Sequence, residues 1–235
     1  MSSKKVLPQN FTFENYSNFD LSSEFWLYFY NSVFITVVST VIGILVASLA
    51  GYAISRFRSP ILGAFSRSLL VLQMFPAGLI LVPLFVVLRN LYLLDTHFSV
   101  IIIYTTLHLP FSVWLFKGFM DAIPQELEEA AFIDGCSRLG TFIRIILPIS
   151  GSGIAAVAIF SFLFTWNEFL IANVFLKNQS LLTLPLGLQK YLQQYSTEWG
   201  ELTAASTLSM MPVLVLLLFV QKYMAYGSLS GSVKG

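Results

Sequence analysis

The sequence predicts an all-α integral membrane protein with about five transmembrane helices and one short helix outside the membrane. Three observations lead to this fold class. The chain has 235 residues, of which 56% are hydrophobic and only 11% are charged, and its mean hydropathy is +0.77. This composition is typical of membrane proteins rather than of soluble domains. Five stretches without charge are long enough to cross a bilayer, and a charged segment separates the third from the fourth.

Each uncharged stretch is expected to form one transmembrane helix. A helix rises about 1.5 Å per residue, so about 20 residues cross a hydrocarbon core roughly 30 Å thick. The stretches run over residues 26–54, 68–88, 98–116, 149–167 and 202–220. Pro76, Pro83 and Pro110 lie within them. Because neighbouring groups in a bundle can satisfy the carbonyls that proline frees, we expect kinks there rather than helix ends.

Lysine and arginine predict the orientation of the chain. Most of them follow the first and third stretches or lie in the tail, namely Arg56, Arg58, Arg67, Lys117, Arg138, Arg144, Lys222 and Lys234. Cytoplasmic segments are enriched in these residues, so we expect the loop 117–148 and the C-terminus to be cytoplasmic. The expected organisation is an external N-terminal segment at 1–24, a transmembrane domain at 25–225 and a cytoplasmic C-terminal tail at 226–235.

The charged segment in this loop is expected to form a short helix. Pro124 suits a first helical turn, where its missing donor would be unpaired, and three acids follow where the helix dipole favours them, namely Glu126, Glu128 and Glu129. Gly135 can adopt the left-handed conformation that commonly closes a helix. About eleven residues, or roughly 16 Å, are too short to cross a bilayer, so this helix should lie at the cytoplasmic surface.

One face of this short helix has the composition of a docking surface. Leu127, Ala130, Ala131 and Asp134 share that face by helical spacing. Paired alanines let another backbone approach closely, and the neighbouring glutamates can meet basic groups on a partner. The same periodicity is equally typical of an amphipathic loop helix that packs on its own bundle, so periodicity alone leaves both interpretations open.

The same segment carries a complete motif, E-A-A-x3-G-x9-I-x-L-P. Its fixed positions are filled by Glu129, Ala130, Ala131, Gly135, Ile145, Leu147 and Pro148. In this motif the chain resembles the permease subunits of bacterial ABC importers. The resemblance implies that the short helix is the coupling helix, which sits in a cleft of a cytoplasmic ATPase subunit on another chain. The motif residues, together with Asp134, are then the docking and coupling residues.

Other segments are similar to those of the carbohydrate-uptake branch, and in particular to the smaller membrane subunit of the maltose transporter. These segments are Trp166-Asn167-Glu168-Phe169, Thr183-Leu184-Pro185 and the tail at 227–235. The resemblance implies a sugar pathway formed with a second, different permease, two ATP-binding subunits, an external solute-binding protein and a place in the bacterial cell membrane. This family usually has six spans, and the resemblance implies that the first is missing here.

The sequence argues against catalysis by this chain. No glycine is followed by Lys and then Ser or Thr, so a phosphate-binding P-loop is absent. We expect ATP and Mg to be bound, and ATP to be hydrolysed, by the partner ATPase subunits. Cys136, the single cysteine, has no metal-ligand cluster to join. We therefore expect no cofactor and no metal in this chain, and its net charge of +1 gives no reason to expect nucleic acid.

A few polar residues in the apolar stretches leave alternatives open. Asn167 and Glu168 fit a substrate pathway or simply a helix end that reaches water. His108 fits a proton relay or a bond to carbonyls freed by Pro110. Ser152 with His108 would fit a protease dyad, whereas small residues at 151–153 also permit close helix packing. The main alternative to an importer subunit is a self-sufficient secondary carrier or channel, but the sequence has neither a clear internal repeat nor intramembrane charge. The substrate-contacting residues stay unknown.

Overall fold

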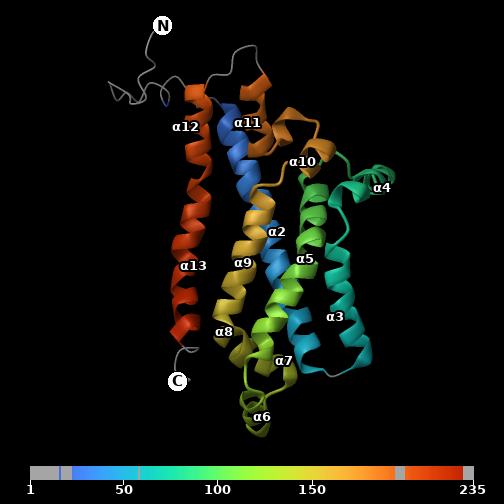
Figure 1. Cartoon of the computed structure of the whole chain (residues 1–235), viewed down its shortest axis with the longest axis vertical. Helices are drawn as coiled ribbons and strands as arrows, with labels where there is room; N and C mark the ends of the chain where they lie inside the picture. Colours follow the sequence, from blue (N-terminus) through green and yellow to red (C-terminus); the bar gives the residue numbers. More distant parts are fainter. Residues whose placement is uncertain (1–15, 17–22, 58, 194–198, 230–235) are drawn as a thin grey trace.

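The chain is a bundle of long helices. The structure, a computed structural model, describes residues 16, 23–57, 59–193 and 199–229, and every regular element in those ranges is a helix. In Figure 1, α2 (Ser23–Arg56), α5 (His97–Asp121) and α9 (Gly151–Trp166) lie in the middle. On the two sides, α13 (Met211–Leu229) packs on α9 and α3 (Pro60–Gln73) packs on α5. The predicted all-α fold is confirmed.

The predicted number of spans is also confirmed as an upper count. Three helical segments of the described chain can each cross a membrane, namely Glu24–Arg56, His97–Asp121 and Trp199–Tyr223. The last of these joins α12 (Trp199–Ser209) to α13. Two bent pairs can add one span each: Pro60–Gln73 with Ala77–Asn90 is bent by 100°, and Arg138–Ile149 with Gly151–Trp166 by 76°.

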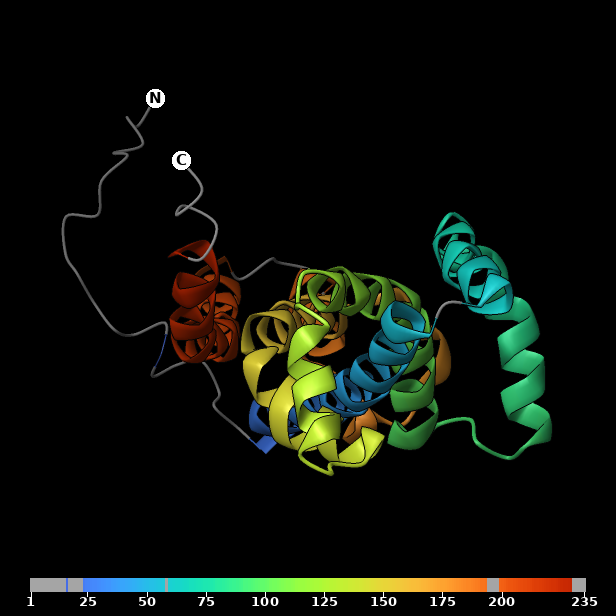
Figure 2. The ribbon, with the colours of Figure 1, turned by 90° about the horizontal axis from the view of Figure 1, so that it is seen from below.

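The second stretch is not the single kinked helix that we predicted. At Pro76 the prediction is wrong, because α3 ends at Gln73 and α4 (Ala77–Asn90) begins only after this proline. The residue before a proline disfavours the helical conformation, so the chain turns at Phe75. Figure 2 shows α4 leaving the end of α3 at a steep angle. Pro83 and Pro110, by contrast, lie inside α4 and α5 without ending them, as predicted.

Glycines allow α5 to lie close to α2 and α9. A Cβ atom at Gly43 of α2 would lie 2.3 Å from Cε1 of His108, and one at Gly153 of α9 would lie 2.9 Å from Cβ of Phe119. Real Cβ contacts are essentially never this short, so larger residues would push the helices apart. The predicted role of the small residues at 151–153 in helix packing is therefore confirmed for Gly153.

His108 joins α5 to α9 in the interior of the bundle. Its Nδ1 lies 3.2 Å from the hydroxyl of Ser161 and 3.4 Å from that of Ser112. The expected bond to a carbonyl freed by Pro110 is not what this ring makes; near the proline, it is Gln73 of α3 that donates to the carbonyl of Leu107, at 3.1 Å. The serines bonded to His108 also differ from Ser152, which a protease dyad would require. The histidine therefore packs helices together.

At the end of the bundle opposite α6, polar side chains hold an irregular segment. It includes α10 (Leu170–Phe175), η2 (Gln179–Leu181) and the start of α11 (Leu184–Gln193), and Figure 1 shows it at the top of the molecule. The Glu168 carboxylate accepts from the backbone N–H groups of Ile171 (2.9 Å) and Ala172 (3.2 Å), and from the hydroxyl of Tyr104 at 2.7 Å. Glu168 thus caps the start of α10 and joins it to α5.

Side chains of α2 and of the loop between α4 and α5 also form hydrogen bonds to this irregular segment. Asn31 of α2 donates to the carbonyls of Ser180 and Leu182 at 2.9 and 3.0 Å. Asp95, just before α5, accepts from the N–H groups of Lys177 and Asn178 at 2.8 and 2.9 Å. In every one of these bonds the irregular segment contributes backbone groups, which would otherwise lack partners.

Candidate functional site

The predicted short helix exists and projects from the end of the bundle. This helix, α6, runs over Glu126–Ile133 and has 8 residues, or about 12 Å at the helical rise per residue. Figure 1 shows it as the lowest point of the molecule, below the ends of α2 and α5. It is shorter than predicted at its start, since Gln125 is the N-cap and Pro124 lies before it. It is too short to cross a bilayer, as predicted.

Gly135 ends the helix in the way that the sequence predicts. Its φ is +82°, in the left-handed region that favours glycine. The N–H of Cys136 donates to the carbonyl of Ala131 at 2.9 Å, and that of Gly135 to the carbonyl of Phe132 at 3.1 Å. These two bonds define a Schellman motif, which satisfies carbonyls left free at a helix C-terminus. The glycine therefore fixes where α6 stops.

Of the two alanines of the motif, Ala130 is exposed and Ala131 is buried, so the prediction of one shared docking face is wrong for Ala131. Ala131 is only 3% exposed and lies against the chain's own bundle. The exposed surface of α6 and its end is formed by other residues, namely Glu126, Leu127, Glu129, Ala130, Phe132, Ile133 and Asp134. Ile133 is 87% exposed. This surface combines acidic groups with uncovered apolar side chains.

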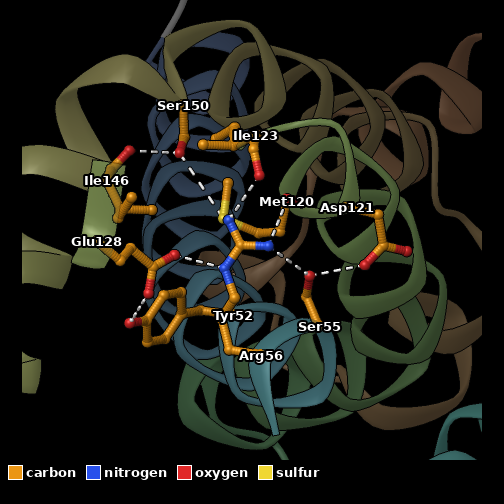
Figure 3. Close-up of polar contacts among 9 residues, drawn as sticks. All are labelled: Tyr52, Ser55, Arg56, Met120, Asp121, Ile123, Glu128, Ile146 and Ser150. Carbon is orange, nitrogen blue, oxygen red and sulfur yellow. Dashed lines mark hydrogen bonds and ion pairs between the residues drawn. The ribbon is translucent and has the colours of Figure 1, made fainter. Parts of the chain in front are cut away.

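The inward face of α6 carries a buried ion pair that the sequence does not reveal. Glu128 pairs with Arg56 at the end of α2, and the two side chains are 7% and 8% exposed. The second carboxylate oxygen of Glu128 accepts from the hydroxyl of Tyr52 at 2.7 Å. Figure 3 shows the arginine, the tyrosine and the glutamate converging on one another between the ribbons. In the sequence, Arg56 is only a topology signal and Glu128 only an acid at a helix start.

The same guanidinium group also reaches the end of α5. Its Nη1 donates to the carbonyl of Met120 and its Nη2 to the carbonyl of Ile123, both at 3.0 Å. Ser55, next to Arg56, donates to Asp121 at 2.6 Å. Arg56 therefore contacts three elements at once, because it lies on α2, pairs with α6 and bonds to carbonyls at the α5 terminus.

A hollow opens beside this cluster on the α6 side. It is lined by Tyr52, Arg56, Phe57, Gln125, Glu128, Glu129, Phe132 and Arg138. At one rim, the guanidinium carbon of Arg138 lies 5.2 Å from the centre of the Phe57 ring, a cation–π arrangement that links the segment after α6 to the end of α2. The hollow thus joins acidic, basic and aromatic groups next to the exposed face of α6.

The second half of the motif lies on a bent connection to α9. α7 (Arg138–Thr141), the π-helical turn η1 (Phe142–Ile146) and α8 (Leu147–Ile149) follow each other directly. Ile145 and Leu147 are half-buried against the core, whereas Pro148 is exposed. The 76° bend between Ile149 and Gly151 combines three known causes of kinks: a π-turn, a proline and a Ser-Gly pair. The motif thus spans two places, the tip at α6 and this bend.

Comparison with known proteins identifies the kind of component to which this geometry belongs. A family described as "Binding-protein-dependent transport system inner membrane component" matches residues 39–226. The chain belongs to this family. The matched part includes the bundle from within α2 onward, the whole of α6 and the bent connection. The chain is accordingly a multi-pass inner membrane component of an ABC transport system, a permease subunit.

Several relatives of this permease subunit resemble it along nearly its whole length. The Inner membrane ABC transporter permease protein YcjP of Escherichia coli is 35% identical over 232 residues, which is 98% of this chain and 83% of YcjP. The Diacetylchitobiose uptake system permease protein DasC of Streptomyces coelicolor is 32% identical, with 97% of this chain and 83% of DasC covered. The Arabinooligosaccharides transport system permease protein AraQ of Halalkalibacterium halodurans is 34% identical, with 97% and 81% covered.

A solved structure supports the same fold for the permease. It is described as a bacterial ABC transporter involved in the import of the acidic polysaccharide alginate, and one of its chains superposes with a TM-score of 0.80. The match covers 92% of this chain and 81% of that chain, at 24% sequence identity. At this level of identity the likeness concerns the arrangement of helices.

Proposed function

We propose that this permease subunit belongs to an ATP-driven importer of a sugar or oligosaccharide, and that α6 docks on a partner ATPase. The observation that carries the proposal is the exposed surface of α6, where Glu129, Ala130, Phe132 and Ile133 stand free at the tip of the molecule. A surface with both acidic and apolar groups fits a cleft that has basic side chains and an apolar base from which water is excluded. The named sugar substrates of DasC and AraQ support the substrate class.

The orientation that this function requires agrees with the positions of the charged residues. Arg56, Arg67, Lys117, Arg138 and Arg144 all lie at or near the α6 end of the bundle or in its connections. Because positive residues concentrate on the cytoplasmic side, the α6 end and the C-terminus are assigned to the cytoplasm. The opposite end, with α10 and α11, then faces the external solute-binding protein.

In the proposed mechanism ATP and Mg are bound by two ATPase subunits, and this chain supplies mechanical coupling. Closure of the ATPase pair moves α6, and the helix bundle passes from an inward-facing to an outward-facing arrangement. Such a mechanism needs a rigid element with two positions, which a capped, tertiary-packed helix can provide. The solute path forms between this chain and a second, different permease. Glu129, Ala130 and Asp134 make the docking contacts, Ala131 and Gly135 fix the helix, and Ile145, Leu147 and Pro148 anchor the connection to α9.

The test is co-purification from the native membrane with a tag on this chain. We expect a P-loop ATPase and a second membrane chain to accompany the wild type. In the Glu129→Lys variant the reversed charge opposes basic groups of the cleft, so the ATPase should be lost while the second permease stays. Arg67→Glu is the control, since it reverses an exposed charge on α3, outside α6 and the motif, and it should retain the ATPase.

Two results would overturn the proposal. The first is a wild-type chain that purifies alone and transports solute after reconstitution, which would favour a self-sufficient carrier. The second is a Glu129→Lys complex that keeps its ATPase and its normal uptake, which would remove α6 from the docking surface.

A further inference from the structure

We propose that Arg56 pins α6 to the ends of α2 and α5, so that these three helices move as one body during transport. In this arrangement Arg56 is a positioning residue. It makes no contact with a solute or a nucleotide and acts by holding the docking helix to two membrane-spanning helices. The inference rests on the proposed docking of α6 to an ATPase, since only then is a force applied to α6.

The first argument is the burial of both charges. Arg56 and Glu128 are each less than one tenth exposed, and both oxygens of the carboxylate are used, one by Arg56 and the other by Tyr52. Separating such a pair would leave an uncompensated charge in a desolvated place, which is strongly unfavourable. A force that displaces α6 is therefore expected to move the residues bonded to Glu128 rather than to break the ion pair. Tyr52 and Arg56 both belong to α2.

The second argument is the geometry of the guanidinium group. One planar group donates in three directions, to Glu128 on α6, to the carbonyl of Met120 near the end of α5 and to the carbonyl of Ile123 just beyond it (Figure 3). Arginine has five N–H donors in a fixed fork, whereas lysine has one rotating ammonium group that cannot hold this arrangement. The residue type itself therefore fits a three-way connection.

The third argument compares the connection of α6 to α2 and α5 with its connection to α9. Towards α9 the chain passes through the π-turn η1, the proline of α8 and a 76° bend. Ser150 at this bend donates to the carbonyl of Ile146, a local bond that often bends helices. The connection to α2 is thus held by a buried ion pair, whereas the connection to α9 is bent and irregular. A movement of α6 is passed directly to α2 and α5 and, through their packing, to α9, whereas α13 packs mainly on α9 and can change its angle to α6.

Distances between spin labels test this directly, without knowledge of the solute. Cys136, the only cysteine of the chain, follows α6 and carries the first label. The second is placed at Leu45→Cys on α2 or at Leu218→Cys on α13, positions that are 58% and 64% exposed. Distances are measured in the whole purified complex, first without nucleotide and then trapped with MgATP and vanadate.

We expect the distance from Cys136 to position 45 to stay unchanged on trapping and the distance to position 218 to shift. With Arg56→Lys, the distance to position 45 should also shift and its distribution should broaden. Glu128→Gln keeps the shape of the side chain and removes its charge, so it should act in the same direction if the lysine variant fails to reach the membrane. Arg67→Lys is the control, since Arg67 is exposed and donates to the carbonyl of Gly63 one turn earlier in the same helix.

The outcomes distinguish the proposed role of Arg56, called the pin below, from the proposed docking of α6 on an ATPase. If the ATPase is present and the wild-type distance to position 45 shifts as much as that to position 218, the pin is wrong and the docking stands. An Arg56→Lys complex whose distances match those of the wild type would likewise overturn the pin and leave the docking intact. If the purified complex holds no ATPase and trapping moves neither distance, the proposed function fails, and the pin fails with it.

Discussion

The two ends of the α2–α5 pair are both fastened by polar side chains, but they use them differently. At the α10 end, Asn31, Asp95 and Glu168 bond to backbone groups of an irregular segment. At the α6 end, the ion pair of Arg56 with Glu128 joins side chains of two regular helices. Backbone groups away from water must find partners, so the bonds at the α10 end are a condition for that segment to fold at all.

The ion pair at the α6 end, by contrast, is not needed to give backbone groups their hydrogen-bond partners. Burying two charges costs desolvation free energy that their attraction roughly offsets, and apolar residues of similar volume often do as well. A buried ion pair is therefore weak as a stabilising device but specific as a geometrical one. The comparison teaches that the α10 end is built to complete the fold, whereas the α6 end is built to keep two helices in a fixed relation.

Removal of one charge at the α6 end is expected to have the largest effect on stability. In Glu128→Ala the guanidinium of Arg56 loses its counter-charge while it stays buried, which should lower the free energy of unfolding by about 3–5 kcal/mol. Unfolding in detergent by a denaturant titration measures this. The double variant Arg56→Met with Glu128→Met should recover part of the loss, because it removes both charges but also the bonds of Arg56 to the carbonyls of Met120 and Ile123. A double variant as unstable as the single one would show that the ion pair itself stabilises the fold.

At the α10 end, Glu168→Ala should cost less and should leave the ATPase bound. The variant removes a charged acceptor to which the hydroxyl of Tyr104 and two N–H groups of α10 donate. Tyr104 is only 1% exposed. Hydrogen bonds to charged groups contribute about 1.5–3 kcal/mol, so we expect a loss of that order in the same titration. Tyr104→Phe removes the hydroxyl alone and should cost less. Loss of the ATPase from the Glu168→Ala complex would contradict the separation of the two ends.

Local patterns are sufficient to predict the spans and the short helix. Uncharged runs of sufficient length decide which segments cross a membrane, and Gly135 marks the end of α6 because its left-handed conformation is a local requirement. The motif residues Glu129 and Ala130 lie on the exposed surface, where the interpretation as a docking helix needs them. Each of these predictions depends on residues close together in the sequence.

Features that depend on distant residues could not be predicted in the same way. Arg56 and Glu128 are 72 residues apart, and nothing in either neighbourhood specifies the other as its partner. This pair turns the Glu128 side of α6 inward and carries Ala131, three residues later, into the interior. The two prolines of the second stretch make the same point, because Pro76 follows the end of one helix while Pro83 is accommodated inside the next. Both prolines follow an apolar residue within an apolar stretch, so their neighbours in the sequence do not distinguish the two outcomes.

The smallest effect is expected for the exposed ion pair near the same end of the bundle. Lys117 and Asp121 are paired one turn apart on α5, but their side chains are 29% and 46% exposed, and Asp121 also accepts from Ser55. Exposed pairs of this kind contribute about 0.3–0.5 kcal/mol, so Lys117→Met should change the free energy of unfolding by no more than that and should leave both spin-label distances unchanged. Two ion pairs thus lie near each other at the α6 end of the chain, and only the buried one is expected to matter. A loss for Lys117→Met as large as for Glu128→Ala would mean that charge near α6, rather than the buried three-way connection at Arg56, holds the helix in place.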